Sequence, residues 1–153
     1  MPIYRQWQKL KHYGWRLLVS IAFGGVLAPI GAWLTLFVLD APRAMQFTIL
    51  AKSITTPLAM ETSAQIGGIP ALAAVFVIVT GVVGAIMATS MFSLFNVTNR
   101  QAQGIALGTV AHAVGTAKAI QMGEDVAAMA ILGLCVNGIF TAVALPIVFG
   151  LFV

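Results

Sequence analysis

The sequence of 153 residues carries little charge: only 8% of its residues are Asp, Glu, Lys or Arg, against roughly 25% in an ordinary soluble domain. So few ionisable side chains cannot cover the surface of a globule of this size. Apolar residues make up 60% of the chain, and its mean hydropathy is +1.00. This composition argues against a soluble enzyme, a disordered tail and a nucleic-acid-binding protein. It predicts an all-α integral membrane protein.

Groups that carry chemistry are also scarce. The single cysteine, Cys135, has no partner for a disulfide or a redox motif, and we expect it to be a small buried apolar side chain. Two histidines and one cysteine give no zinc-ligand spacing, and no phosphate-binding loop or Ser-His-acid set is present. We therefore expect no metal, no cofactor and no catalytic residues, and a protein that is not an enzyme.

The net charge of +4 reflects topology rather than nucleic-acid binding. Half of the basic residues lie in the first sixteen positions, with no acid among them: Arg5, Lys9, Lys11 and Arg16. Cytoplasmic flanks of membrane helices are enriched in Lys and Arg. We expect residues 1–16 to form a basic cytoplasmic lead-in on the lipid surface, followed by a membrane domain over 17–153.

Three long uncharged stretches predict full transmembrane helices. The first, 17–39, contains 23 residues and reaches roughly 35 Å at about 1.5 Å per residue, enough to cross a bilayer. It is followed by 69–95 and 126–153. Glycines within the last two stretches indicate close helix packing, which small residues permit in membranes.

Two further segments, 52–68 and 104–121, are apolar but contain charges and backbone breakers. They predict broken or re-entrant segments, because ionisable groups at membrane depth are costly and usually functional. Thr56 and Ala59 in the first correspond to Thr116 and Ala119 in the second, with the same offset of 60 residues. Paired interrupted segments of this kind, an internal repeat, typically mark the binding site of a transporter.

The residues at the breaks favour binding of an anion. In the first segment, Thr56 is expected to cap a half-helix that begins with Pro57. In the second, Gly115 is expected to break the chain and Thr116 to cap the half-helix that carries Lys118. Free N–H groups at a helix N-terminus attract anions, and Lys118 there suits a carboxylate from a substrate or from Glu61.

Structural alternatives exist for each feature. Thr55 and Thr56 can bond back to helix carbonyls, and Lys52 can extend to the membrane interface. The four-residue spacing of Gly104, Gly108 and His112 is that of a helix packing stripe, in which His112 is a structural group rather than a proton carrier. The acids Glu124 and Asp125 suit the N-terminus of the last helix.

Topology has two solutions. If 44–66 is re-entrant, Arg100 lies on the cytoplasmic side with the N-terminus, and the two broken units form an inverted pair. If 44–66 spans the membrane, Arg100 lies outside and the units are parallel. The charge rule favours the first solution by one arginine.

Four stretches together resemble the LrgB/CidB family, and the similarity covers essentially the whole chain. They are Lys52–Glu61, Ile66–Gly81, Ala111–Lys118 and Asn137–Ala142. The family comprises bacterial inner-membrane proteins described as antiholin-like, and it includes the plastid glycolate/glycerate translocator. The resemblance implies a multi-pass permease for small 2-hydroxy or 2-oxo carboxylates that works beside a holin-like partner of the LrgA/CidA type.

Family members carry additional N-terminal transmembrane helices, so we expect this chain to correspond to the C-terminal part of the family. We expect a homo-oligomer that binds a carboxylate anion and the lipid bilayer. The rival hypothesis is an antiholin-like regulator of murein hydrolase activity that transports nothing itself. The candidate substrate-binding residues are Thr55, Thr56, Pro57, Glu61, His112, Gly115, Thr116 and Lys118.

Overall fold

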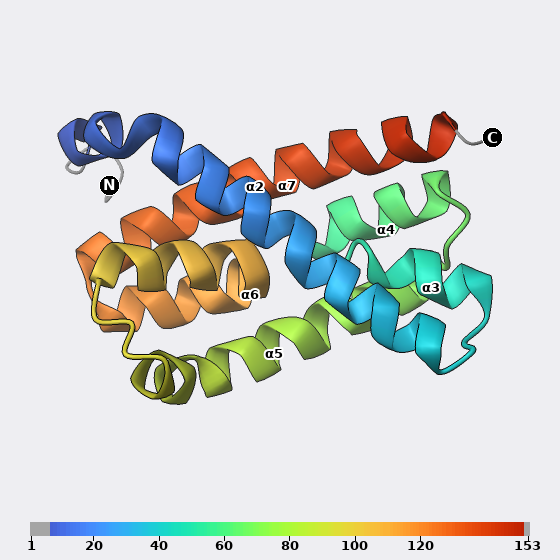
Figure 1. The fold of residues 1–153 in the computed structure, drawn as a ribbon, viewed down its shortest axis with the longest axis horizontal. Coiled ribbons are helices and arrows are strands. Elements are labelled where there is room, and N and C mark those ends of the chain that lie inside the picture. The colour runs from blue at the N-terminus through green and yellow to red at the C-terminus, as the bar shows by residue number, and fades with distance from the viewer. Residues whose placement is uncertain (1–6, 152–153) are drawn as a thin grey trace.

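The computed structural model describes residues 7–151, and side chains from residue 14 onward. This part of the chain is all helical, without strands, which confirms the predicted fold class. Figure 1 shows the helices as a bundle. They are α2 (Trp7–Val38), α3 (Arg43–Ile49), α4 (Thr56–Gln65), α5 (Pro70–Leu94), α6 (Arg100–Met122) and α7 (Glu124–Gly150). Arg5, part of the expected lead-in, lies outside the described residues.

Three helices are long and apolar enough to cross a membrane: residues 14–38 of α2, and the whole of α5 and α7. They match the predicted stretches to within a few residues. Pro70 opens α5, where its missing N–H costs nothing. The acids Glu124 and Asp125 lie in the first turn of α7, as expected from the helix dipole. In Figure 1, α2 and α7 run from one end of the bundle to the other, and α5 runs back.

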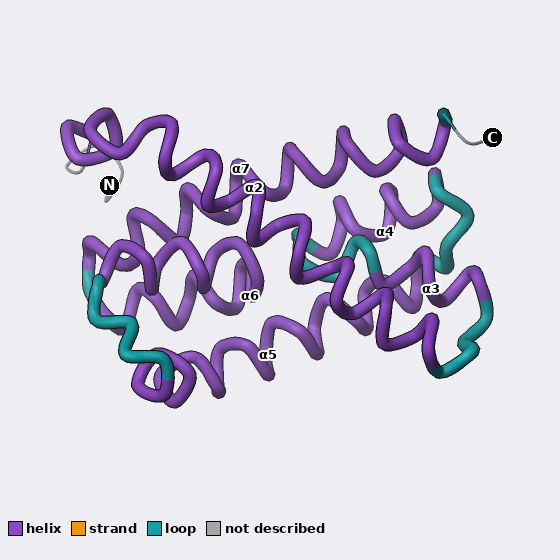
Figure 2. The backbone as a smooth tube through the Cα atoms, viewed as in Figure 1, coloured by secondary structure: helices purple, strands orange, loops and turns teal. Residues whose placement is uncertain are grey.

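Helices α3 and α4 together form the first re-entrant hairpin. The chain enters along α3 from the end of the bundle where α2 stops, turns over residues 50–55, and leaves along α4 toward the same end (Figure 2). Ala51, Ser53 and Ile54 in this turn are buried. The turn therefore lies inside the protein, where irregular backbone is tolerated at membrane depth.

Helix α6 is the second re-entrant hairpin, and it consists of two helical halves that meet at a kink. Its backbone departs from helical geometry at His112, with φ 42° and ψ −126°. The two halves double back at this residue, so that both ends of α6 lie at the opposite end of the bundle from α3 and α4 (Figure 1). The two hairpins thus enter from opposite ends.

This arrangement matches the first of the two topologies. Arg16 on α2 and Asn99, which precedes α6, line the same crevice. Arg100 therefore lies at the same end of the bundle as the start of α2. An inverted pair of units follows, since α5 and α7, which succeed the two hairpins, run in opposite directions (Figure 1).

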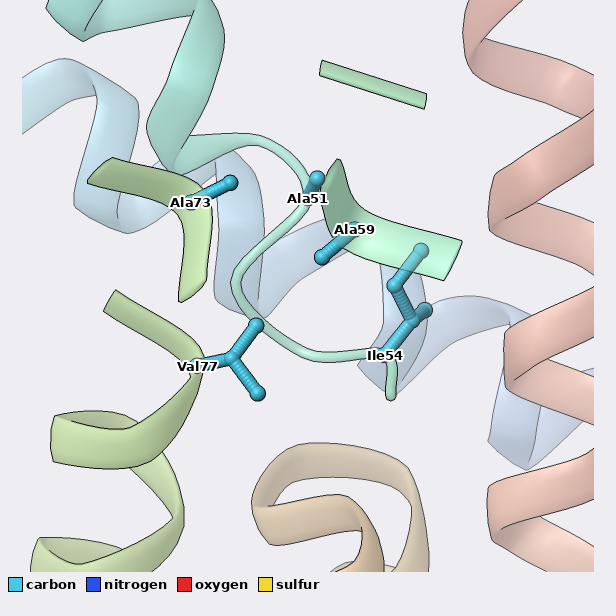
Figure 3. Close-up of a cluster of buried hydrophobic side chains, with 5 residues drawn as sticks. All are labelled: Ala51, Ile54, Ala59, Ala73 and Val77. Atoms are coloured by element: carbon cyan, nitrogen blue, oxygen red, sulfur yellow. The ribbon is translucent and has the colours of Figure 1, made fainter. Parts of the chain in front are cut away.

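Small side chains bring the first hairpin against α5. Figure 3 shows Ala51 and Ile54 of the turn and Ala59 of α4 in one cluster with Ala73 and Val77 of α5. All five are at most 1% exposed. Without a hydrophobic driving force between helices in lipid, this close contact supplies the dispersion energy that holds the hairpin in place.

Glycines allow a similarly close contact between α6 and α7. A Cβ at Gly104 would meet the carbonyl of Val126, and one at Gly108 would meet the carbonyl of Ala130. The packing interpretation of these two glycines is confirmed. The expectation for Cys135 is wrong: its side chain is exposed on α7, beside the exposed Ile139. An apolar stretch predicts burial in lipid as readily as burial in protein, so hydropathy alone cannot separate the two.

Candidate functional site

The tips of the two hairpins are joined by one buried side chain, Asn137 of α7. Its Nδ2 donates to the carbonyl of Ser53, in the first tip, at 2.9 Å, and to the carbonyl of Thr109, next to the second tip, at 3.0 Å. The side chain is fully buried. An amide in an apolar interior is stable only if it is hydrogen-bonded, and both of its donors are used here.

The second tip is also tied to α5. His112 is 2% exposed, and its Nε2 donates to the carbonyl of Val77 at 2.9 Å. A carbonyl oxygen can only accept, so the ring carries a proton on Nε2. In the neutral imidazole, Nδ1 is then the nitrogen that accepts. Gly81 makes room for the ring, since a Cβ there would lie 2.7 Å from His112 Cε1.

These contacts follow the internal repeat. Val77 of α5 and Asn137 of α7 are 60 residues apart, the same offset that separates Thr56 from Thr116. Each holds the tip of the hairpin that belongs to the other unit. The predicted repeat therefore has a structural counterpart in which equivalent positions of the two long helices perform equivalent tasks.

Lys52 lies at the first tip. Its side chain is partly buried, and Nζ donates to Ser53 Oγ at 3.2 Å. The carbonyl of Ser53, next to Lys52, and the carbonyl of Thr109, three residues before His112, both accept hydrogen bonds from Asn137. The structure thus brings Lys52 of one tip and His112 of the other into one neighbourhood, between the ends of the bundle.

The first predicted capping residue is displaced by one position. Thr55, with φ −68° and ψ 149°, is the N-cap of α4, and Thr56 is its first residue; the prediction of Thr56 as the cap is wrong. Pro57 lies in the first turn, as predicted, and the Thr55 side chain makes no capping hydrogen bond. A proline disfavours helical backbone at the residue before it, yet the helix already starts at Thr56. Because the Thr55 side chain forms no capping bond, it does not satisfy the N–H groups of this first turn.

The break in the second segment also differs from the prediction. The chain turns at His112, three residues before Gly115. Gly115 instead allows close packing, because a Cβ would meet the carbonyl of Leu107 and the side chain of Ala111. Thr116 is not a cap: its Oγ1 donates to the carbonyl of His112 at 2.8 Å. A glycine in a membrane segment marks close approach as often as a break, and sequence alone does not separate the two.

The two candidate charges remain apart. Glu61 is exposed on α4 and accepts a hydrogen bond of 2.9 Å from Gln65 Nε2. Lys118 is half-buried on the second half of α6. Within residues 14–151, no ion pair joins them; the ion pair at the helix ends is between Arg100 and Asp125, at 3.2 Å. A substrate carboxylate therefore stays the predicted partner of Lys118.

The arrangement has a definite electrostatic character. Helix α4 begins at the first tip, and the second half of α6 begins at the other tip, so two helix N-termini lie between the ends of the bundle (Figure 2). Unsatisfied N–H groups and the helix dipole make such termini favourable to anions. Among the described residues, no group of three or more His, Cys, Asp or Glu gathers as a metal site.

Sequence reasoning missed Ser53, Thr109 and Asn137 as members of this centre. A signal existed for Asn137, because it is the one amide in the apolar stretch 126–153. Polar side chains deep in membrane helices usually bond to other helices or to backbone. Ser53 and Thr109 contribute carbonyl oxygens, which every residue has, so no pattern of residue types could have identified them.

Two re-entrant hairpins that enter from opposite ends of a bundle of membrane-spanning helices define this chain as an inverted-repeat membrane protein. The model of the LrgB-like family matches residues 1–151, and the chain belongs to that family. The membrane assignment and the resemblance found in the sequence are both confirmed.

Several curated proteins are similar over nearly the whole chain. The antiholin-like protein LrgB of Bacillus mycoides is 35% identical over 146 residues, and those of Bacillus cereus and Bacillus anthracis are 36% identical. Each match covers 95% of this chain but 64% of the relative. The chain therefore spans less than two thirds of the length of these proteins. No solved structure matches.

Proposed function

We propose that this chain forms the binding centre of a membrane transporter for small 2-hydroxy and 2-oxo carboxylates, of the size of glycolate, glycerate or pyruvate. One observation carries the proposal: two hairpins from opposite ends bring the N-termini of two half-helices to the middle of the bundle. Transporters with inverted repeats bind substrates at such discontinuous helices. An anion is favoured because helix N-termini present N–H donors and partial positive charge.

The candidate residues receive distinct roles. The first turn of α4 supplies backbone N–H groups to the carboxylate, and Thr55 and Thr56 supply hydroxyls. Pro57, which has no N–H of its own, fixes the start of the helix. Lys118 supplies the opposite charge, since it is half-buried and forms no ion pair with Glu61. Gly115 and Thr116 shape the second half-helix by packing and by a hydrogen bond to the His112 carbonyl.

Proton coupling is assigned to Glu61 or His112. Glu61 is exposed on α4 and accepts one hydrogen bond, from Gln65. His112 has one nitrogen engaged with Val77 and Nδ1 as its remaining site for a proton. The proposal assigns no enzymatic reaction to the chain.

Uptake by proteoliposomes tests the proposal. The chain is reconstituted alone and, in parallel, with the remaining part of a Bacillus cereus relative supplied as a second chain, and uptake of labelled glycolate and pyruvate is measured. We expect Thr56→Ala and Lys118→Gln to lower uptake about tenfold, as expected for loss of a hydrogen bond to a charged group. Cys135→Ala, on the exposed face of α7, serves as the control. Full uptake by both site variants would overturn the site assignment.

The second candidate is an antiholin-like regulator of murein hydrolase activity that acts with a holin-like protein of the LrgA/CidA type. The names of the curated relatives favour it at least as strongly as transport. Co-purification with such a partner, together with absence of carboxylate flux in both reconstituted preparations, would establish this function in place of transport.

We place the protein in the bacterial inner membrane as a homo-oligomer, with residues 1–16 as a cytoplasmic lead-in and 17–153 as the membrane domain. The basic residues of the lead-in support this orientation. Arg100, at the same end of the bundle as Arg16, adds one further positive charge to that side. Accessibility of an introduced cysteine at Arg16 from the cytoplasmic side tests the orientation.

A further inference from the structure

Asn137 is the one side chain in residues 14–151 that hydrogen-bonds to the tip regions of both hairpins. Its two bonds cross 84 residues to Ser53 and 28 residues to Thr109. Both acceptors are backbone carbonyls beside the points where the helices are interrupted. Interrupted helices leave carbonyls without their usual i+4 partners, and in an apolar interior each needs a substitute donor. Asn137 supplies both from one planar amide.

The orientation of the Asn137 amide is fixed by the groups around its oxygen, Oδ1. Thr141 Oγ1, one turn along α7, lies 3.4 Å from Asn137 Oδ1 and donates to it. Gly25 of α2 packs against the same oxygen so closely that a Cβ there would collide with it. With Oδ1 enclosed by α2 and α7, Nδ2 has a single direction, toward the two tips. Four elements therefore meet at one side chain: α2, the first tip, α6 and α7.

We propose that Asn137 is a positioning residue that couples the two hairpin tips, so that the two half-helix N-termini move together rather than separately. Its effect on transport rests on the proposed function above, but the coupling of the tips does not. The specific claim is that loss of one amide loosens both tips, although they are far apart in sequence and enter from opposite ends. A residue that only fills space in α7 has no reason to do so.

Cysteine labelling of the tips tests the coupling without any transport measurement. Single cysteines are placed at Ser53 or Thr109, each 2% exposed, in a Cys135→Ala background. The rate of modification by a water-soluble methanethiosulfonate is measured in proteoliposomes. We expect slow labelling at both sites with Asn137 present, and at least a tenfold rise at both sites with Asn137→Asp, which keeps the shape of the side chain but replaces the donating amide.

Two further variants complete the experiment. Thr141→Val removes the hydroxyl behind Oδ1 and leaves the amide in place, so a smaller rise at both tips is expected; this variant keeps the test valid if Asn137→Asp fails to fold. Ile139→Ala, on the exposed face of the same helix, is the control and should change neither rate. Helical circular dichroism and elution as a single species establish that each variant is folded.

The outcomes separate the two proposals. A rise at both tips supports the coupling, even if the parent protein transports no carboxylate and the proposed function fails. A rise at one tip only, no rise at either in folded variants, or an equal rise with Ile139→Ala overturns it. If uptake is present, Asn137→Asp should lower it in parallel with the loss of protection at the tips.

Discussion

The imidazole of His112 in α6 donates a hydrogen bond of 2.9 Å from Nε2 to the backbone carbonyl of Val77 in α5. His112 itself has φ 42° and ψ −126°, a conformation that suits glycine and strains other residues. Such strain, of about 1–3 kcal/mol, persists only where the surrounding contacts impose it, and it is common at functional sites. Here one residue makes both the turn and the contact that holds the turn in place.

This double role predicts an unusual order of stabilities at position 112. His112→Ala loses the hydrogen bond but keeps the strained backbone, whereas His112→Gly loses the bond and relieves the strain. We expect the glycine variant to be more stable than the alanine variant by about 1 kcal/mol, the reverse of their order in a regular helix. Unfolding titrations in detergent with sodium dodecyl sulfate measure the difference. An alanine variant at least as stable as the glycine variant would contradict the strained turn.

Packing of α6 against α7 predicts a strong effect of one added methyl group. In Gly108→Ala, the new Cβ meets the carbonyl of Ala130, which cannot move aside without displacing α7. We expect a loss of about 1–3 kcal/mol in the free energy of unfolding. Gly31→Ala in α2 is the matched control, because its Cβ would meet nothing within 4 Å. The same detergent titration compares them, and equal stabilities would refute the close contact.

The re-entrant hairpins predict a pattern of sidedness. In a Cys135→Ser background, single cysteines replace Arg43 and Gln65 at the two ends of the first hairpin, or Thr98 and Gln121 at the ends of the second. We expect both members of each pair to react with a membrane-impermeant maleimide from the same side, and the two pairs to react from opposite sides. Labelling of intact cells and of inverted vesicles measures this. Opposite sidedness within a pair would mean a full span in place of a hairpin.

The hydroxyls of the two predicted capping threonines should contribute unequally to substrate binding. Thr116 Oγ1 already donates its proton to the carbonyl of His112 at 2.8 Å, so it has none to offer an anion. We expect Thr56→Val to raise the KM for uptake about tenfold and Thr116→Val to change it by less than about threefold, in line with the loss or retention of a hydrogen bond to a charged group. Concentration-dependent uptake distinguishes the two variants, and a larger effect at Thr116 would reverse the assignment.

Several features were predictable from composition and pattern. The three spans follow from uncharged stretches long enough to cross a bilayer, and Pro70 and Asp40 mark where two of them begin and end. The interruption near Pro57 follows from its missing N–H. The inverted arrangement was one of two topologies, with a single arginine in its favour, and the position of Arg100 near Arg16 agrees with it.

Other features required the tertiary structure. Nothing local marks His112 as the turn of α6, because a left-handed backbone at a non-glycine residue is imposed by its contacts, here the bond to Val77.

What the sequence by itself determined is where the chain enters lipid, because hydropathy and helix length are sums over neighbouring residues. What only the tertiary structure decided is which tips meet and through which atoms. The two bonds of Asn137 end on backbone carbonyls of Ser53 and Thr109, groups that are the same in every residue. Their partners are therefore set by how the helices pack in space, which residue identity does not encode locally.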